Sequence, residues 1–303
     1  MRRLLASLLA VGALSACATP APTLNAEGLI ADLRTLSADH MQGRRTGQDG
    51  GRLALAYVVG RFQTLDLDTP ASGRTQGFDF TSRGGAALHG TNVVGVIRGT
   101  RVPDRWIVIT AHYDHEGVSP AGEIYNGADD NASGVATMLE IARQLKLAPP
   151  EHSVLIVALD AEERGLHGAR AFVANPPVPL TSMSMNLNFD MTAREDDGHL
   201  WVVGTHQNPA LRPILETVQP SGPVSLAFGK DTPADLGENN WVNASDHAAF
   251  HARGVPFIYM GADYHADYHK PTDDFERITP AVFLAASELA VRSFRALDRA
   301  LDR

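Results

Sequence analysis

Apolar residues recur along this chain with two different spacings, and each spacing predicts one kind of element. Segments 26–38 and 51–67 carry apolar residues three or four positions apart, which predicts helices. Short runs of apolar and β-branched residues predict strands at 92–98, 106–111, 153–159, 185–189, 200–203 and 255–260. Helical spacing returns at 135–145, 166–174 and 280–301. Because such alternation is typical of a sheet covered on both faces, we expect a three-layer α/β/α fold with a mostly parallel central mixed sheet.

The first residues follow a different pattern, which predicts export. Two arginines follow Met1, an apolar stretch covers 4–14, and Leu14-Ser15-Ala16-Cys17 comes next. A basic start, a short apolar core and a small-residue site are typical of a secretory signal. The last four of these residues resemble the bacterial lipobox, whose cysteine is acylated; the alternative is an ordinary signal peptide in which Cys17 is incidental. We expect a lipoprotein signal at 1–17, a proline-rich tether at 18–23 and one large domain at 24–303. The lipid on Cys17 would hold this domain at a bacterial membrane, which we expect to be the outer membrane, on its periplasmic side.

Charge, cysteine content and hydropathy limit the kinds of partner and of covalent link that this chain is expected to have. The formal net charge is −9, and no basic stripe is visible, so a nucleic-acid partner is not expected. Cys17 is the only cysteine, so the predicted domain forms no internal disulfide. No segment after the predicted signal has an apolar run of membrane-spanning length, which leaves the lipid on Cys17 as the expected membrane contact.

Imidazole and carboxylate side chains follow the predicted strands, at the edge where ligands bind in parallel sheets. The clusters are His112-Tyr113-Asp114-His115, Asp129-Asp130-Asn131, Asp160-Ala161-Glu162-Glu163, Asp190, and the segment 263–269 that ends at His269. Each cluster alone has an ordinary explanation, since a single histidine is often structural and paired acids often begin a helix. Together they gather carboxylates at one edge, where mutual repulsion raises their pKa values. A bound cation removes that conflict.

Taken together, these motifs resemble the M28 family of zinc aminopeptidases, whose members are dizinc exopeptidases. The resemblance rests on five motifs in the family's order: Ala111-His112-Tyr113-Asp114, 126–134, Asp160-Ala161-Glu162-Glu163-Arg164-Gly165, Asn188-Phe189-Asp190-Met191 and 268–274. Segment 245–250 and the early Gln42-Gly43-Arg44 loop are also similar, with less diagnostic force. The resemblance implies a phosphorylase/hydrolase-like zinc exopeptidase fold over roughly residues 24–301.

The resemblance also implies roles for single residues. Asp129 would bridge two zinc ions, one of which also takes Glu163 and His269 and the other His112 and Asp190. Asp114 would orient His112, a cis peptide bond before Asp130 would aim Asp129, and Glu162 would be the general base. The family's last ligand precedes a Lys-Pro-Thr-Asp-Asp stretch, which favours His269 over His265.

Several neighbouring residues keep two interpretations. Met191 is assigned to the substrate pocket, although an ordinary core position explains it equally well. Asp246 and His247 are also assigned to that pocket, with a plain helix start at Ser245 as the alternative. His115 and His251 are expected to be structural or to contact ligands from behind.

These residues predict an aminopeptidase that uses two zinc ions to remove N-terminal residues from short peptides. A glutaminyl cyclase-like acyltransferase with a single zinc and a non-catalytic binding protein are the alternatives on the same fold. An M20-type enzyme is disfavoured, because the 79 residues from Asp190 to His269 leave little room for its extra domain. The sequence leaves the oligomeric state and the preferred first residue open.

Overall fold

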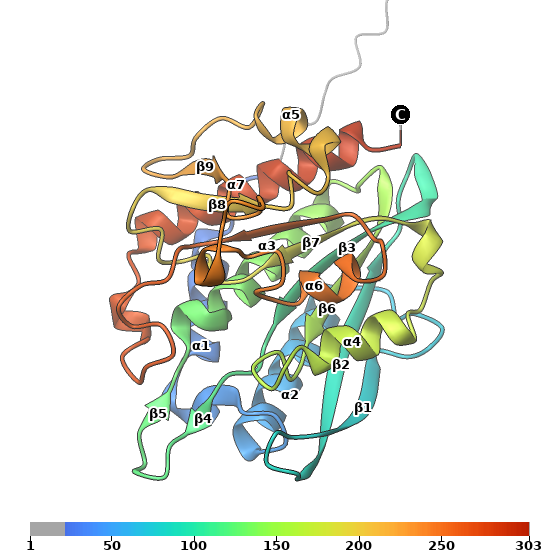
Figure 1. Cartoon of the computed structure of the whole chain (residues 1–303). Coiled ribbons are helices and arrows are strands. Elements are labelled where there is room, and N and C mark those ends of the chain that lie inside the picture. Colours follow the sequence, from blue (N-terminus) through green and yellow to red (C-terminus); the bar gives the residue numbers. More distant parts are fainter. Residues whose placement is uncertain (1–21, 303) are drawn as a thin grey trace, which may run out of the picture.

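The computed structural model describes residues 22–302, so the predicted signal segment and Cys17 lie outside the described residues. One eight-stranded sheet forms the centre, with the strand order β1-β2-β6-β3-β7-β10-β8-β9 (Figure 1). Its strands are β1 (Thr75–Thr81), β2 (Ala87–Ile97), β3 (Val102–His112), β6 (His152–Leu159), β7 (Met183–Phe189), β8 (His199–Val203), β9 (Ser225–Phe228) and β10 (Phe257–Gly261). Strands β4 (Gly117–Val118) and β5 (Ile124–Tyr125) form a separate small hairpin.

The centre of the sheet is parallel and the remainder is mixed. Strands β6, β3, β7 and β10 are neighbours and run in one direction. Strand β2 joins β1 and β6 in antiparallel fashion, and β8 joins β10 in the same way. The carboxyl ends of the four parallel strands therefore meet at one edge, which confirms the predicted mixed sheet and places the loops after these strands together.

Helices cover both faces of the sheet (Figure 1). One face carries α1 (Ala26–Leu36), α2 (Asp49–Thr64), α3 (Gly134–Leu147), α5 (Arg212–Leu215) and α7 (Pro280–Ala300). The other face carries α4 (His167–Ala174) and α6 (His247–His251). Strand β6 shows why: Val154 and Ile156 belong to the core on the first face, whereas Leu155 and Val157 belong to the core on the second. Side chains of a strand alternate between the two faces of a sheet, so an uninterrupted apolar run packs against helices on both faces.

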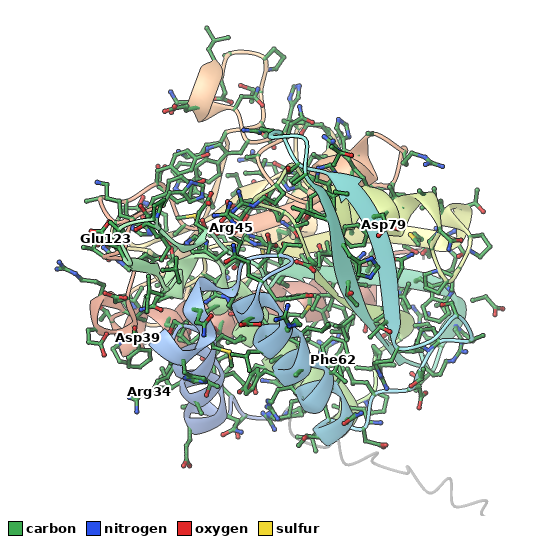
Figure 2. All side chains as sticks on the ribbon, turned by 90° about the horizontal axis from the view of Figure 1, so that it is seen from below. Arg34, Asp39, Arg45, Phe62, Asp79 and Glu123 are labelled. Carbon is green, nitrogen blue, oxygen red and sulfur yellow. The ribbon has the colours of Figure 1, made fainter. Side chains whose placement is uncertain are left out.

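The region before β2 differs from its prediction. The sequence pattern predicts no element between the helix at 51–67 and the strand at 92–98, but strand β1 lies there and pairs with β2 in a long hairpin. Its side chains alternate between exposed and half-buried, as on an edge strand, so no apolar run marks it. Figure 2 shows this hairpin, with Asp79 on it, beside α2. Within residues 22–302, no helix is long and apolar enough to cross a membrane.

The loop between α1 and α2 sends a buried arginine into the centre of the fold. Arg44 is fully buried, and its guanidinium donates to the carbonyl oxygens of Leu36 at 2.7 Å, Tyr113 at 2.9 Å, Asn126 at 2.5 Å and Gly127 at 2.8 Å. These carbonyls belong to the end of α1, the loop after β3 and the loop before α3. Burial lowers the pKa of Arg44 to about 10, and nearby carboxylates counter this effect, so the guanidinium stays charged at neutral pH.

We expect Arg44→Lys to destabilise the fold by about 3 kcal/mol or more, because one ammonium cannot reach carbonyls on three segments and leaves several of them without a donor. Urea unfolding followed by circular dichroism measures the change. The neighbouring Arg45→Lys is the control, since Arg45 donates only to the Glu116 carbonyl oxygen, at 3.1 Å. Equal stability of the two variants would contradict a central role for Arg44.

A second buried ionic cluster joins the start of β6 to the end of α7. The Asp298 carboxylate accepts hydrogen bonds from the backbone N–H of Glu151 and of His152, both at 2.9 Å, and lies 3.0 Å from His152 Nδ1. Burial opposes a charged His152, but Asp298 and Asp302 outweigh it and raise the pKa of the imidazole. Burial also opposes the Asp298 carboxylate, but hydrogen bonds from His152 and the backbone outweigh it and lower the carboxyl pKa.

This cluster gives the stability a defined pH dependence. The contribution of Asp298 is complete above the ordinary carboxyl pKa of about 3.9, and that of His152 is complete below the ordinary imidazole pKa of about 6.5. We therefore expect Asp298→Asn to cost about 2 kcal/mol between those values, and less once the pH rises through the raised pKa of His152. Urea unfolding at pH 5.5 and pH 9 measures this. Glu288→Gln, which removes an exposed carboxylate on the same helix, is expected to change stability by less than about 0.5 kcal/mol at either pH.

Candidate functional site

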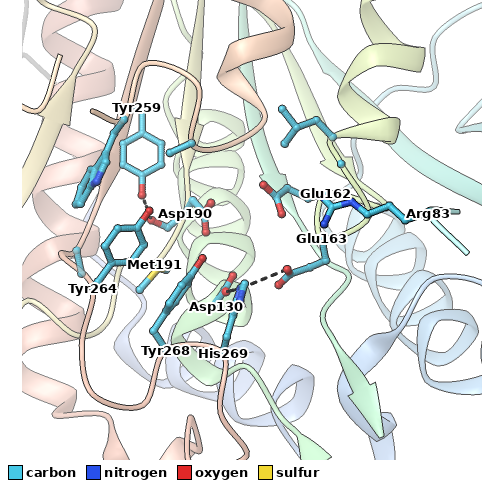
Figure 3. A pocket seen from close by; sticks show the side chains of 15 residues that line it. Arg83, Asp130, Glu162, Glu163, Asp190, Met191, Tyr259, Tyr264, Tyr268 and His269 are labelled. Carbon is cyan, nitrogen blue, oxygen red and sulfur yellow. Dashed lines mark hydrogen bonds and ion pairs between the residues drawn. The ribbon is translucent and has the colours of Figure 1, made fainter. Parts of the chain in front are cut away.

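Five loops bring acids and imidazoles to the carboxyl edge of the parallel strands (Figure 3). His112 is the last residue of β3, and Asp190 directly follows β7. Glu162 and Glu163 follow β6, whereas His269 lies in the loop after β10. The fifth contribution comes from the segment Ala128–Ser133, which leads into α3. His112, Asp190 and the segment Ala128–Ser133 are buried, Glu162 and Glu163 are half-buried, and His269 is partly exposed.

The carboxylate of Asp130 lies between two pairs of side chains. Its Oδ1 is 3.4 Å from His112 Nε2, and that nitrogen is 3.2 Å from Asp190 Oδ1. Its Oδ2 is 3.0 Å from His269 Nε2, and that nitrogen is 3.3 Å from Glu163 Oε2. One oxygen therefore faces His112 and Asp190, and the other faces His269 and Glu163.

The structure contradicts the expected position of Asp129. Its Oδ2 is 3.2 Å from His265 Nε2, and its Oδ1 accepts a hydrogen bond from the backbone N–H of Ala193 at 2.7 Å. Both carboxylate oxygens are therefore engaged by other partners, and within residues 22–302 no hydrogen bond or ion pair joins them to His112 or His269. The cis peptide bond also lies one position later than expected, between Asp130 and Asn131. Two adjacent aspartates look alike in sequence, and only the backbone path decides which of them faces the cluster.

Asp114 positions more residues of the cluster than His112, the one that it was predicted to orient. His112 Nδ1 lies 3.2 Å from the backbone carbonyl oxygen of Asp114 and 3.6 Å from its carboxylate. The same carboxylate accepts hydrogen bonds from the backbone N–H of Glu162 at 3.0 Å and of Glu163 at 3.4 Å. Asp114 thus fixes the two glutamates as well as the histidine, and it is a positioning residue.

His115 contacts the cluster directly, whereas the sequence predicts that it is structural or contacts ligands from behind. Its Nδ1 is 2.8 Å from Glu163 Oε1, and its ring meets the His269 ring edge-on with centroids 5.9 Å apart. Gly127 makes room for this ring, because a Cβ atom at that position would lie 2.5 Å from it. The signal available in the sequence was its place one residue after Asp114, in the same loop as His112.

A cavity of about 240 Å³ opens in front of the cluster. Its lining includes Asp130, Glu162, Glu163, Asp190 and His269, together with an aromatic wall (Figure 3). The wall consists of Trp241, Tyr259, Tyr264 and Tyr268, and Met191 lies beside it. Met191 thus lines the cavity, and its assignment to a substrate pocket stays a prediction.

The assignment of Asp246 and His247 to this pocket is wrong. Both residues are fully buried, and neither lines the cavity. His247 Nε2 is 2.8 Å from the Trp241 carbonyl oxygen, and the ring stacks on Phe257 in the core. The alternative interpretation of this pair is the better one, because Asp246 and His247 begin helix α6 behind the wall.

The electrostatics of the cluster call for a cation. Burial raises the pKa of Glu162 well above its ordinary value, and the charges of Glu163, Asp246 and Asp190 add to the rise. Burial likewise raises the pKa of Asp246 to about 8. Burial opposes a charged His269, but hydrogen bonds to Asp130 and Glu163 raise its pKa to about 11. The pocket thus concentrates negative groups where water cannot screen them.

The donor atoms fit divalent metal. Ligand atoms of His112, Asp130 and Asp190 lie within 4.8 Å of one another, and so do those of His115, Asp130 and Glu163. A third such group is Glu116, Glu163 and His269. Imidazole nitrogen combined with carboxylate oxygen is a ligand set that zinc prefers, so the residues present suit that ion.

Solved structures of the same fold match most of the chain. A Zn-dependent exopeptidase from Parabacteroides distasonis superimposes with a TM-score of 0.73 and 18% identity, covering 91% of this chain and 99% of that one. BSAP, a zinc aminopeptidase from Bacillus subtilis, gives a TM-score of 0.73 at 18% identity, covering 93% and 97%. A glutaminyl cyclase from Porphyromonas gingivalis gives 0.71 at 19%, covering 89% and 98%. At such low identity these matches establish the fold alone.

Sequence comparison gives the family. Aminopeptidase YwaD of Bacillus subtilis (strain 168) is 28% identical over 210 residues, which are 65% of this chain and 42% of YwaD. Leupeptin-inactivating enzyme 1 of Streptomyces exfoliatus is 27% identical over 269 residues, 86% of this chain and 54% of that enzyme. The chain spans about half the length of these curated relatives. The model of peptidase family M28 matches residues 92–293, which hold all the cluster residues, and the chain therefore belongs to peptidase family M28.

Proposed function

We propose that this chain is a zinc-dependent aminopeptidase that removes N-terminal residues from short peptides with two zinc ions. The observation that carries the proposal is the Asp130 carboxylate, whose two oxygens face two separate pairs of donors. His112 and Asp190 would hold one zinc, and Glu163 and His269 the other, with Asp130 shared between them. Bound zinc would supply the Lewis acidity that polarises the scissile carbonyl and lowers the pKa of water.

Glu162 is the proposed general base. Its side chain lines the cavity, whereas its backbone N–H is fixed by Asp114. Glu162 is not needed to link the two donor pairs, so its carboxylate is left to accept the proton of the attacking water. The same carboxylate then returns that proton to the nitrogen of the leaving amine.

The size of the cavity favours the end of a peptide substrate over its middle. A volume of about 240 Å³ accommodates one or two residues, and the aromatic wall suits an apolar side chain at the first of them. The free amino group of the substrate would meet carboxylates in the same cavity. Short peptides with an apolar first residue are accordingly the proposed substrates.

Export remains a proposal that rests on sequence alone. The signal pattern at 1–17, with Cys17 as the lipid-bearing residue and 18–23 as a tether, would hold the domain from residue 24 onward at the outer membrane facing the periplasm. Peptides in that compartment would then be the substrates.

Glu162→Gln tests the proposed mechanism. We expect turnover of leucyl p-nitroanilide to fall by about 10³-fold or more, because an amide cannot accept the proton, while zinc content stays at the level of the unsubstituted protein. Activity of the unsubstituted protein should also be lost on treatment with a chelator and return with added zinc. Glu123→Gln, an exposed change in the β4–β5 turn, is the control and should keep full activity. Full activity in Glu162→Gln would exclude the assigned base.

Asp130→Asn and Asp129→Asn form a matched pair that tests the proposed metal ligands. We expect elemental analysis to find two zinc ions per chain in the unsubstituted protein and in Asp129→Asn, and fewer in Asp130→Asn, since an amide is a poor bridging ligand. Circular dichroism confirms that each variant is folded. Metal loss confined to Asp129→Asn would restore the interpretation that the structure contradicts. One zinc per unsubstituted chain, with cyclisation of N-terminal glutamine, would favour the glutaminyl cyclase alternative.

A further inference from the structure

The cavity has two chemically different ends. Figure 3 shows Tyr259 and Tyr264 at one end and Arg83 at the other, with Asp190 and Asp130 between them. Arg83 is the only arginine or lysine that lines this cavity within residues 22–302. The aromatic end suits an apolar side chain, whereas the other end offers a positive charge beside Glu162 and Glu163.

The β1–β2 hairpin holds Arg83 over the cavity. Arg83 lies in the turn between the strands, where Ser82 and Ala86 are joined by a backbone hydrogen bond of 2.8 Å and by a bond from Ala86 N–H to Ser82 Oγ of 3.1 Å. The hairpin is fixed to the main body as well, because Phe80 stacks on His167 at the start of α4 with ring centroids 4.3 Å apart. These contacts keep the turn close to Gly165 and Leu166, which line the same end of the cavity.

Within the described part of the chain, the guanidinium of Arg83 has no partner. No hydrogen bond, ion pair or aromatic contact involves this side chain among residues 22–302, although most other arginines there have one. Glu163 is already engaged by His115 and His269. An exposed arginine in a cavity, with its donors free, is available to a group that the substrate brings.

The proposed mechanism sets the orientation of the substrate, and the inference therefore rests on the proposed function. Glu162 returns a proton to the leaving nitrogen, so the second residue of the substrate must lie at the Glu162 end of the cavity. Arg83 occupies that end (Figure 3). We propose that Arg83 binds a carboxylate of the second residue, either the terminal carboxylate of a dipeptide or the side chain of an aspartate or glutamate, and so makes such peptides preferred substrates. A planar guanidinium suits a carboxylate because two parallel N–H donors match its two oxygens.

Four substrates and three variants test the proposal. The substrates are Leu-Gly, Leu-Gly amide, Leu-Asp amide and leucyl p-nitroanilide, of which the first and third carry a carboxylate on the second residue. The variants are Arg83→Ala, Arg83→Lys and Arg299→Ala, the last removing an exposed arginine on α7 that does not line the cavity. We expect Arg83→Ala to lower kcat/KM for Leu-Gly by about tenfold, chiefly through KM, and to change Leu-Gly amide and the anilide by less than about twofold. Arg83→Lys should recover part of the loss, and Arg299→Ala should resemble the unsubstituted protein.

The pattern of losses identifies the carboxylate. A loss on Leu-Gly alone assigns Arg83 to the terminal carboxylate, and a loss that includes Leu-Asp amide extends its role to acidic side chains. An equal loss on all four substrates would mean that Arg83 only balances the charge of the acidic cluster, and no loss on any of them would mean that it binds nothing; either result overturns the proposal.

A binding measurement separates this proposal from the proposed function. Calorimetric titration of Leu-Gly and its amide into zinc-loaded Glu162→Gln protein, with and without Arg83→Ala, measures carboxylate recognition without turnover. We expect Leu-Gly to bind about tenfold more weakly when Arg83 is absent, and the amide to bind equally in both. If the unsubstituted protein releases leucine from none of the substrates, the proposed aminopeptidase activity fails, and the titration still decides whether Arg83 binds the carboxylate.

Discussion

The site depends first on the buried guanidinium of Arg44. Its donors bind carbonyl oxygens from the end of α1, from the loop that follows His112 and from the loop that leads to Asp130. These three segments are not contiguous in the sequence. Loop carbonyls in the interior would otherwise lack donors, at a cost in stability. One side chain thus satisfies this requirement for three segments and, in doing so, fixes two of them relative to each other. The precision of the site originates here, outside the cavity.

A second constraint is the concentration of negative charge beyond the strand ends. Parallel strands deliver their loops to one edge, so residues far apart in sequence become neighbours without any requirement that they attract one another. Asp130, Asp190, Glu162 and Glu163 gather there with three imidazoles, and Asp114 accepts hydrogen bonds from the backbone N–H groups of the two glutamates. Such an arrangement is unfavourable for carboxylates alone and favourable around cations. The carboxylates that would bind a metal ion therefore lower the stability of the metal-free fold, as is common at functional sites.

The elements around the cavity decide what reaches the cluster. The aromatic wall comes from the segment before α6, from β10 and from the loop after β10, while Arg83 comes from the β1–β2 hairpin at the other edge of the sheet. The loop after β10 thus carries both part of the aromatic wall and the proposed ligand His269, whereas the turn that holds Arg83 contributes no proposed metal ligand. This separation allows the turn around Arg83 to vary while the cluster and the sheet stay unchanged.

The sequence alone determined the fold class, the two helical layers and most of the cluster. Apolar runs such as 153–159 define buried strands, and the acids or histidines that follow them must meet, because the parallel strands all end at one edge. The choice of His269 over His265 also agrees with the structure, in which His265 contacts Asp129 instead. The direction in which several of these side chains point could be seen only in the folded chain. Whether Asp129 or Asp130 faces His112 depends on the backbone path, which two adjacent residues of the same type do not reveal. In the same way, only the fold shows that Asp246 and His247 are buried without lining the cavity. The β1 strand and Arg83 were missed for a related reason: an edge strand with alternating half-buried residues leaves no apolar run, and the importance of an exposed arginine depends on what the fold places beside it.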